Sequence, residues 1–461
     1  MPSSLPTSRA TSDPPGPRIN FVLAIIAQIL PRLFPPFDPL AFAIDNARRF
    51  GNMAFYRVGP LRVYQLNSPE LVREILVEHP EKFHKARFIK RAFQPFAGQG
   101  LLTIDGDLWK RQHKLIQPAF HHTELARYSQ IMVAHALRLM DSFRDGEVRE
   151  MNAEMMKLTL SVVVKSLFGA EFSSEAEETG TLMTAVLRAV NGRLSSAVQI
   201  PSWVPTPRNL QEKRALARIE GMLRSLIEER RRSPDRRNDL LSVLLTAVDE
   251  ESGMGMSDKQ LRDEMLTLFV AGHETTANAL TWTWYLLSKH PSVEAKLIAE
   301  LDRVLGDRLP TVADLRQLPY TEMIVRESLR LYPPAPGFAR EPTENVRIGG
   351  FEIPSGSLLA VNTYALHREA RFFGDPERFD PERFAAGWEE RIPRYAYLPF
   401  GGGPRVCIGN GFAMMEARLI IATMTRKWQF LLEPDQQIVP VQLVTLRPKN
   451  GIRMKLKRRE K

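Results

Sequence analysis

The sequence predicts a mainly α-helical protein with a small β component, because two patterns recur along its 461 residues. Apolar residues return at three- and four-residue spacing through most of the chain, which is typical of amphipathic helices. Alternating, strand-like runs are short, and they occur near the N-terminus and in residues 338–363. The lengths of these elements leave no obvious linker. We therefore expect one catalytic domain over residues 36–461, preceded by a separate segment over residues 1–35.

The N-terminal segment has the composition of a tail. Its first 20 residues are rich in proline and serine and are expected to be disordered. Phe21–Leu30 is an apolar run that is too short to span a bilayer, and its upstream flank lacks the layout of a signal peptide. We expect a cytoplasmic protein whose membrane contact, through Phe21–Phe37, is at most peripheral.

The remaining elements are assigned in chain order. Ala41–Phe50 reads as a helix, and Ala54–Val58 and Leu61–Leu66 read as strands. Helical periodicity then continues over Trp109–Phe120, Glu124–Phe143, Met151–Phe168, Glu175–Val190, Leu210–Arg232, Ser257–Lys289, Val293–Leu305, Val312–Leu315 and Thr321–Leu331. Prolines directly after residue 332 end the last of these helices. Residues 338–363 read as short strands, a further helix begins at about Asn410, and Val441–Leu456 reads as a terminal hairpin.

Composition and charge restrict the class of protein. The chain is 44% hydrophobic and 25% charged, as in ordinary soluble proteins. Its single cysteine excludes an internal disulfide and fits a reducing compartment. The net charge of +10 predicts acidic partners. No nucleic-acid-binding module is visible, so nucleic acid is not the expected partner.

Cys407 lies in the run FGGGPRVCIG, residues 400–409. A lone thiolate can serve as the single axial ligand of haem, because the porphyrin supplies the other four ligands. The glycines let backbone approach a flat cofactor closely, and Arg405 offers a permanent cation to a propionate. The helix that begins at about Asn410 is expected to lower the pKa of the thiol. The alternative is a buried structural cysteine.

The spacing Phe-x-x-Gly-x-Arg-x-Cys-x-Gly resembles the haem-binding loop of the cytochrome P-450 family, the haem-thiolate monooxygenases. The resemblance covers the chain from about Pro36 to Leu456. It implies the family's triangular fold, with a large helical part and a small β-sheet part. It also implies haem b (iron protoporphyrin IX) as the cofactor, with Cys407 as the metal ligand and with Phe400, Gly401 and Arg405 in contact with the haem.

The long helix contains AGHETT, residues 271–276. A Thr275 hydroxyl can bond the carbonyl of Ala271 and open the helix there, while Gly272 removes a side chain from the same turn. Glu274 places a carboxyl beside that hydroxyl, and together they form a plausible proton relay. The simpler alternative is a polar stripe on an amphipathic helix. The motif resembles the oxygen-activating helix of the same family, in which Thr275 takes the position of the catalytic threonine.

Glu327 and Arg330 have the i, i+3 spacing that puts both side chains on one helical face. Glu228 and Arg231 show the same spacing in a charge run, where solvation is expected. The first pair instead lies among apolar residues. By resemblance, Glu327, Arg330 and Arg383 match a buried Glu–Arg–Arg cluster that supports the loop leading to the haem cysteine.

Trp109 and His113 are four residues apart on one predicted helix, so both can face one propionate. Many relatives carry arginine where His113 stands, and the alternative is a packing histidine. Arg340 resembles another propionate-binding position. The resemblance also implies a pocket for an oily substrate, with walls at Leu102, Thr267, Val270, Ala271, Ala335, Gly337, Phe338 and Val444.

The predicted function is that of a haem-dependent monooxygenase that inserts one atom of O2 into a hydrophobic small molecule, either fatty-acid-like or terpenoid. The long helix and the haem loop most resemble soluble bacterial fatty-acid hydroxylases. The single cysteine excludes a four-cysteine iron–sulfur centre in this chain, so electrons are expected from a separate ferredoxin or flavodoxin with its reductase. Two alternatives stay open: a peroxide-driven or rearranging haem-thiolate enzyme, and a non-catalytic haem-binding gas sensor or carrier.

Overall fold

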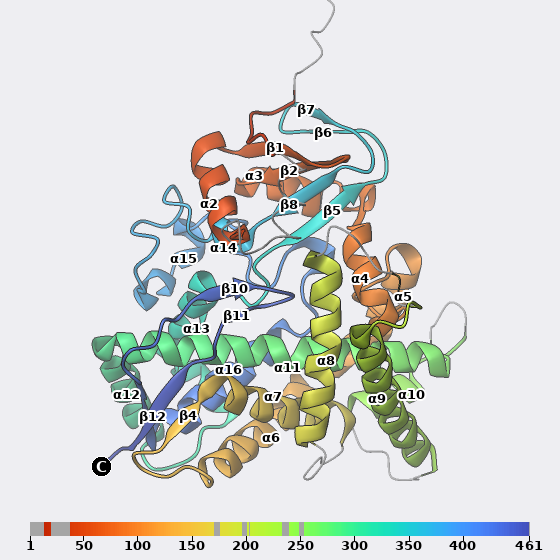
Figure 1. Ribbon diagram of the computed structural model, residues 1–461. Coiled ribbons are helices and arrows are strands. Elements are labelled where there is room, and N and C mark those ends of the chain that lie inside the picture. The colour runs from red at the N-terminus through yellow and green to blue at the C-terminus, as the bar shows by residue number, and fades with distance from the viewer. Residues whose placement is uncertain are drawn as a thin grey trace, which may run out of the picture.

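The structure, a computed structural model, describes residues 13–19, 37–169, 176–195, 201, 203–232, 239–248 and 253–460. Helices dominate this part of the chain, and the strands form four small sheets (Figure 1). The predicted mainly α-helical class is therefore confirmed. Phe21–Leu30, the apolar run of the N-terminal segment, lies outside the described residues. No helix among the described residues is long and apolar enough to cross a membrane.

The α-helices keep the labels of Figure 1. They are α2 (Pro39–Phe50), α3 (Pro69–Arg73), α4 (Arg87–Ala97), α5 (Gly106–Ile116), α6 (His122–Met140), α7 (Met151–Phe168), α8 (Ala176–Ser195), α9 (Pro207–Arg232), α10 (Leu240–Thr246), α11 (Asp258–Lys289), α12 (Pro291–Leu305), α13 (Pro319–Leu331), α14 (Thr363–Leu366), α15 (Trp388–Arg391) and α16 (Asn410–Thr425). A π turn covers Glu74–Glu78, and 3-10 turns cover Pro80–Lys82, Gln117–Phe120, Val312–Gln317, Pro381–Phe384 and Gly403–Arg405.

The largest sheet has five strands in the order β1-β2-β8-β5-β3. Its strands are β1 (Met53–Val58), β2 (Leu61–Leu66), β3 (Phe83–Lys85), β5 (Phe338–Pro342) and β8 (Leu358–Val361). The β2–β8 pair is parallel, and the other three pairs are antiparallel. The smaller sheets join β4 (Val148–Glu150), β12 (Arg453–Arg458) and β9 (Trp428–Leu432), then β6 (Val346–Ile348) and β7 (Phe351–Ile353), and then β10 (Pro440–Gln442) and β11 (Leu446–Pro448).

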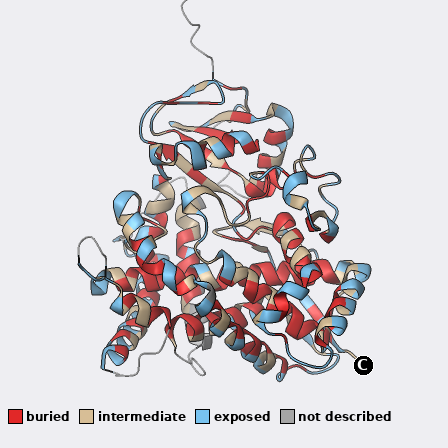
Figure 2. Cartoon of the chain, turned by 180° about the vertical axis from the view of Figure 1, so that it is seen from behind, coloured by how far each residue is buried: buried red, intermediate tan, exposed pale blue. Residues whose placement is uncertain are grey.

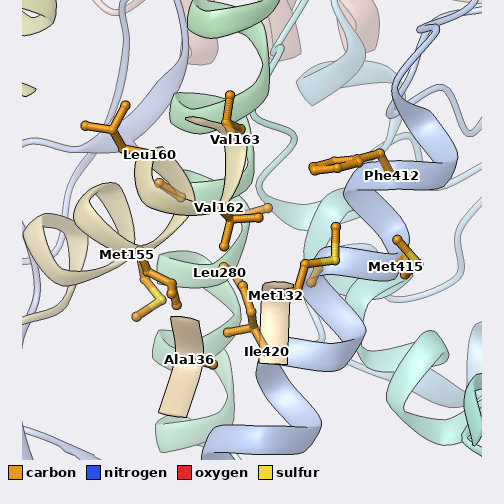
Figure 3. Close-up of a cluster of buried hydrophobic side chains, with 14 of the residues drawn as sticks. Met132, Ala136, Met155, Leu160, Val162, Val163, Leu280, Phe412, Met415 and Ile420 are labelled. Carbon is orange, nitrogen blue, oxygen red and sulfur yellow. The ribbon is translucent and has the colours of Figure 1, made fainter. Parts of the chain in front are cut away.

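The helix α11 runs across the helical part of the molecule, and buried residues surround it (Figures 1 and 2). Ser257 and Gln260 begin it with a capping box, in which each side chain bonds the backbone N–H of the other residue. Figure 3 shows how its core face is packed. Fully buried side chains meet there from α6, α7, α11 and α16: Met132, Val163, Leu280 and Ile420. This packing fixes α16, and with it the preceding Cys407 loop, against α11.

Most predicted elements are found within a few residues of their predicted ends, and Met151–Phe168 coincides with α7. The helix α4 was not expected, since Pro95 interrupts its sequence pattern. The terminal hairpin is only partly correct. Strands β10 and β11 pair with each other, but β12 leaves them and pairs with β9 and β4. The disorder expected for the N-terminal segment does not extend to residues 13–19, because the Pro15 carbonyl accepts the N–H of Phe55 at 3.0 Å.

Candidate active site

The Cys407 loop is a tight turn between the 3-10 turn at Gly403–Arg405 and α16. The Cys407 N–H donates to the Phe400 carbonyl at 3.0 Å, and the Cys407 carbonyl accepts from Asn410 at 3.3 Å. Gly403 has φ +66°, and a Cβ there would collide with the carbonyl of Leu76. Glycine is needed at residue 403 because another backbone segment of the protein lies against it. From the sequence, a cofactor was expected to lie there instead. A Cβ on Gly401 would meet no atom within 4 Å, so this glycine fits the predicted role.

The Cys407 side chain keeps accessible surface although protein surrounds it. Reduced hydration raises the pKa of its thiol, and the N–H of Gly409 only partly opposes that rise. The sequence predicted a lowered pKa from the helix start, so that expectation is wrong for the protein alone. A bound metal ion favours the deprotonated sulfur directly, and the cofactor would therefore supply what the helix does not.

A buried ion cluster supports this loop. Arg330 donates to both carboxylate oxygens of Glu327 at 2.7 and 2.8 Å, and Arg383 donates to one of them at 3.2 Å. The side chains of Glu327 and Arg330 are fully buried. The remaining Arg330 N–H groups donate to the carbonyls of His367, Pro376 and Arg378. The three sequence-predicted residues thus meet, and Arg330 also holds the segment that runs toward the loop.

His367 extends the cluster to the Cys407 loop, and the sequence analysis did not identify it. Its Nε2 accepts the N–H of Leu398 at 2.8 Å, and its Nδ1 lies 3.2 Å from the Arg330 carbonyl. An acceptor at Nε2 leaves the proton on Nδ1, which then donates to that carbonyl. Burial, followed by the charge of Arg330, lowers the pKa of His367 to about 3. The ring is therefore neutral and serves as a fixed donor and acceptor.

The predicted propionate contacts gather on one side of this loop. Arg405 pairs with Asp105 at 3.2 Å, and its guanidinium lies 6.0 Å from the Trp109 ring. The Trp109 ring packs against the His113 ring, with centroids 4.9 Å apart. Burial lowers the pKa of His113, and the nearby charge of Lys85 adds to this effect. His113 is therefore expected to be a neutral partner in this group.

Cations exceed carboxylates at this place. Arg340 lies opposite Lys85 in the β5–β3 pairing, and Asp105 also accepts from Lys90 at 3.1 Å. Burial, with the charge of Arg405 adding to it, lowers the pKa of Arg340 to about 10. Burial lowers the pKa of Lys85 to about 7, although Asp105 opposes this change. Among the described residues of this group, the Asp105 carboxylate is thus shared by four cationic side chains: Lys85, Lys90, Arg340 and Arg405. Further anionic groups, such as two haem propionates, would stabilise them.

The middle of α11 carries a small accessible window. Over Asp263–Trp284, all of which is described, only Ala271, Gly272 and Thr275 are not buried. A Cβ on Gly272 would come within 3.0 Å of Val163, so this glycine allows α7 to approach. The sequence predicted only that Gly272 removes a side chain from the turn of Thr275, whereas here it makes room for the Val163 side chain. Ala271 and Thr275, one turn apart, therefore form the accessible part of the helix.

Thr275 and Glu274 face different partners. The Thr275 hydroxyl donates to the Ala271 carbonyl at 2.6 Å, as predicted. The Glu274 carboxyl is buried and accepts the Thr445 hydroxyl at 2.7 Å. Burial raises the pKa of Glu274, whereas Thr445 and the charge of Arg447 oppose the rise. The Glu274 carboxyl thus lies one residue from the Thr275 hydroxyl, and Thr445 links it to the turn between β10 and β11.

The predicted pocket residues divide into two groups. Thr267 and Val270 are buried, and a Cβ on Gly100 would collide with the Thr267 hydroxyl. Thr267 therefore packs under residue 100. The other six predicted residues are accessible or half-buried: Leu102, Ala271, Ala335, Gly337, Phe338 and Val444.

Two of the segments that carry these residues are joined by hydrogen bonds. The N–H of Leu446 donates to the Pro334 carbonyl, next to Ala335, at 2.9 Å. Asn278 of α11 donates to the Thr445 hydroxyl at 3.0 Å. The turn that carries Val444 thus bridges α11 and the segment before β5.

Sequence reasoning missed four residues of the site: Lys85, His367, Glu416 and Thr445. Glu416 offered the clearest signal, because a lone carboxylate among the apolar residues of α16 needs a reason. It is fully buried, lies beside Thr276, and has a pKa raised well above the usual range by burial. Lys85 and Thr445 gave no comparable signal, since short polar strands and turns contain such residues routinely.

These features fit a haem group. The cysteine has accessible surface, Gly401 meets no neighbour within 4 Å, and the cation group has one carboxylate. The accessible window of α11 adds a hydroxyl at the place where oxygen chemistry is expected. A model of the family described as cytochrome P450 matches residues 14–456. The chain belongs to the cytochrome P450 family. Members of this family carry haem held by a cysteine thiolate, and this chain is a haem-thiolate monooxygenase.

Three relatives show the same family. Cyclooctatin synthase and cyclooctat-9-en-7-ol 5-monooxygenase, both from Streptomyces melanosporofaciens, are each 36% identical to this cytochrome P450. Those matches cover 87% and 85% of this chain, and 88% and 85% of the relatives. Pentalenene oxygenase from Streptomyces avermitilis is 34% identical over 91% of this chain and 92% of its own. None of these three names is that of a fatty-acid hydroxylase.

The ion cluster yields a stability prediction. Replacing Glu327 by Gln leaves the buried Arg330 and the half-buried Arg383 without their carboxylate. The free energy of unfolding should therefore fall by about 3–5 kcal/mol. Glu228→Gln is the matched control, because its exposed pair with Arg232 should contribute about 0.5 kcal/mol or less. Urea unfolding of the haem-loaded proteins measures both. Equal effects of the two changes would contradict the support that we assign to Glu327.

His367 yields a pH prediction. Folding keeps its ring neutral down to about pH 3, whereas the unfolded ring gains a proton below about 6.5. The stability that His367 contributes is therefore present above pH 6.5 and is lost as the pH falls. His367→Gln keeps an acceptor but does not titrate. Between pH 7.5 and 5.5, the stability difference between the wild type and this variant should shrink by about 1.4 kcal/mol.

Denaturant titrations at the two pH values measure this change. The exposed His79, replaced by Gln in the same way, is the control. A stability difference between the wild type and His367→Gln that is independent of pH would show that the folded protein does not keep this ring neutral.

Proposed function

We propose that this cytochrome P450 binds haem b through Cys407 and oxygenates a carbocyclic terpenoid, with electrons from a separate protein donor. The observation that carries the proposal is the accessible window of α11, where Ala271, Gly272 and Thr275 interrupt an otherwise buried stretch. The names of the relatives, which include pentalenene and cyclooctat-9-en-7-ol, support a compact cyclic substrate.

Haem, when bound, supplies the binding and reductive activation of O2. Arg340, Arg405 and Lys85 would meet its propionates, and the half-buried Trp109 and His113 complete that side. Charge-assisted hydrogen bonds of this kind are stronger than neutral ones, because both partners carry charge. Cys407, two residues after Arg405, would hold the iron. The ion cluster at Glu327 would keep this loop in place.

Protons would reach the reacting oxygen through α11. The Thr275 hydroxyl donates its hydrogen to the Ala271 carbonyl, so its oxygen remains free to accept a proton. It would pass its own proton on by turning away from that carbonyl. Burial raises the pKa of Glu274 above that of an exposed carboxyl, which favours a role as proton donor. Thr445 accepts a bond from Asn278 and donates to Glu274, which fixes the carboxyl within the helix–turn junction.

The substrate would lie over Ala271, with Leu102, Ala335, Gly337, Phe338 and Val444 as its walls. All of these side chains are apolar or absent, so they offer hydrocarbon contact and few hydrogen bonds. Such a site favours a substrate that presents hydrocarbon surface to the oxidant. A rigid ring system loses little conformational entropy on binding, in contrast to a long flexible acyl chain.

The first experiment tests ligation and substrate class together. Reduced, carbon-monoxide-treated protein should show the long-wavelength Soret band of thiolate-bound haem, and Cys407→Ser should lose it. Pentalenene, added to the oxidised wild type, should shift the Soret band at lower concentration than a saturated fatty acid. Absence of the Soret band would refute the ligation proposal, and preference for the fatty acid would refute the terpenoid proposal.

The second experiment tests the role of Thr275. Thr275→Ala removes the hydroxyl of the window, so product formed per NADPH consumed should fall by about tenfold, with hydrogen peroxide as the diverted product. Thr281→Ala is the control, because Thr281 makes the same bond to the i−4 carbonyl but is fully buried. Spinach ferredoxin with its reductase can supply electrons. Product formation from peroxide alone, unaffected by the change, would instead indicate the peroxide-driven alternative.

A further inference from the structure

Two adjacent carboxylates near the start of α11 have no part in the proposed chemistry. Asp263 and Glu264 are 1% and 0% exposed, and they lie about three helical turns before Thr275. Buried carboxylates are costly unless hydrogen bonds compensate them. Their partners are backbone N–H groups of the loop that connects α4 to α5. That loop, residues 98–105, carries Leu102 of the proposed pocket wall.

The hydrogen bonds from this loop are short. Asp263 accepts the N–H of Gln99 at 2.7 Å, and Glu264 accepts the N–H of Leu101 at 3.0 Å. The other oxygen of Asp263 pairs with Arg262 at 2.5 Å, and Arg262 also pairs with Glu220 of α9. The two carboxylates therefore fasten alternate residues of the loop to α11, and one of them is tied further to α9.

Steric contacts support the same arrangement independently. A Cβ on Gly98 would collide with the Asp263 carboxylate, and a Cβ on Gly100 would collide with the Thr267 hydroxyl. Gly98 has φ +49°, which favours glycine in any case. The backbone of the loop at Gly98 and Gly100 thus lies directly on the side chains of Asp263 and Thr267.

The opposite side of the loop is held by Lys85. Its Nζ donates to the carbonyls of Leu101 and Ile104 at 2.5 and 2.8 Å. Leu101 is therefore bonded at its N–H by Glu264 and at its carbonyl by Lys85. Since Lys85 also belongs to the cation group at Asp105, the loop connects the proposed propionate site with α11.

We propose that Asp263 and Glu264 are positioning residues for substrate: by holding residues 98–101 on α11, they set the place of Leu102 and hence the shape of the pocket. The inference rests on the proposed function, because Leu102 matters only if substrate binds there. It assigns neither carboxylate a contact with substrate or haem. It predicts that loosening the loop changes which ligands fit, while the fold and the haem stay intact.

The protonation of Glu264 provides a sharp pair of variants. Burial is the main cause that raises the pKa of Glu264 to about 8, and the charge of Asp263 adds to it. The N–H of Leu101 and the charge of Lys85 oppose this rise. At pH 7 the protonated form therefore predominates, and glutamine has nearly its shape and hydrogen-bonding pattern. Gln112 of α5 lies against the second oxygen of Glu264 and can match either group by turning its amide. Glu264→Gln should keep the loop fastened, whereas Glu264→Leu should release it.

The test uses haem-loaded protein at pH 7 and two readouts. Hydrogen exchange of the Leu101 amide should become about tenfold faster in Glu264→Leu, the effect of losing one buried hydrogen bond, and stay unchanged in Glu264→Gln. The affinity for 4-phenylimidazole, whose ring extends toward the pocket walls, should change by about tenfold in Glu264→Leu. Imidazole, which is too small to reach Leu102, should bind all variants within about twofold.

Asp258→Asn is the control, because Asp258 is an exposed carboxylate on the same helix. If Glu264→Leu yields no haem protein, Gly100→Ala replaces it, since the added methyl pushes the loop off Thr267 without touching either carboxylate. Unchanged exchange at Leu101, or equal changes for both imidazoles, would overturn the inference. Loss of the thiolate Soret band in the wild type would refute the proposed function instead, so the two failures are distinguishable.

Discussion

The buried carboxylate of Glu327 is the interaction on which the rest of the site depends. It neutralises Arg330 and Arg383 and also accepts the N–H of Asp380 at 2.9 Å. Arg330 could not remain buried without it, because an uncompensated guanidinium strongly destabilises a folded core. Arg330 donates to three backbone carbonyls, and His367 accepts the N–H of Leu398, which precedes the Cys407 loop. The Glu327 carboxylate thus helps to determine where that loop lies.

A second constraint acts from the β-sheet side of the molecule. The backbone of Gly403 lies so close to the Leu76 carbonyl that a Cβ would collide with it. The turn before Cys407 is therefore held by the segment around Leu76 as well as by the Glu327 cluster. α16 then packs against α11 through the core of Figure 3. The sulfur and the accessible window of α11 are therefore fixed by different parts of the chain, and neither position depends on the loops that surround the substrate. This separation lets the chemistry stay constant while the pocket varies.

Much of this organisation could be predicted from sequence, and the failures have physical reasons. The helix over Met151–Phe168 and the pairing of Glu327 with Arg330 follow from the spacing of residues that are close in sequence, so the sequence alone predicts them. The roles of Gly272 and Gly403 were misjudged, because a glycine does not reveal whether a cofactor or another backbone segment approaches it. The pKa of Cys407 was misjudged since burial depends on residues distant in sequence. Lys85 and His367 act through contacts across 16 or more positions, which no local pattern contains.

The narrowness of the window on α11 has an evolutionary consequence. The Thr275 hydroxyl bonds the Ala271 carbonyl, and Gly272 packs against Val163. Within the window of α11, Ala271 is therefore the one residue whose side chain can be exchanged without losing such a contact. Selection for new substrates must then act mainly on connecting segments such as the turn at Val444. Differences in substrate choice among descendants of this chain should therefore lie in their connecting segments, while the sequence of the central helix changes less.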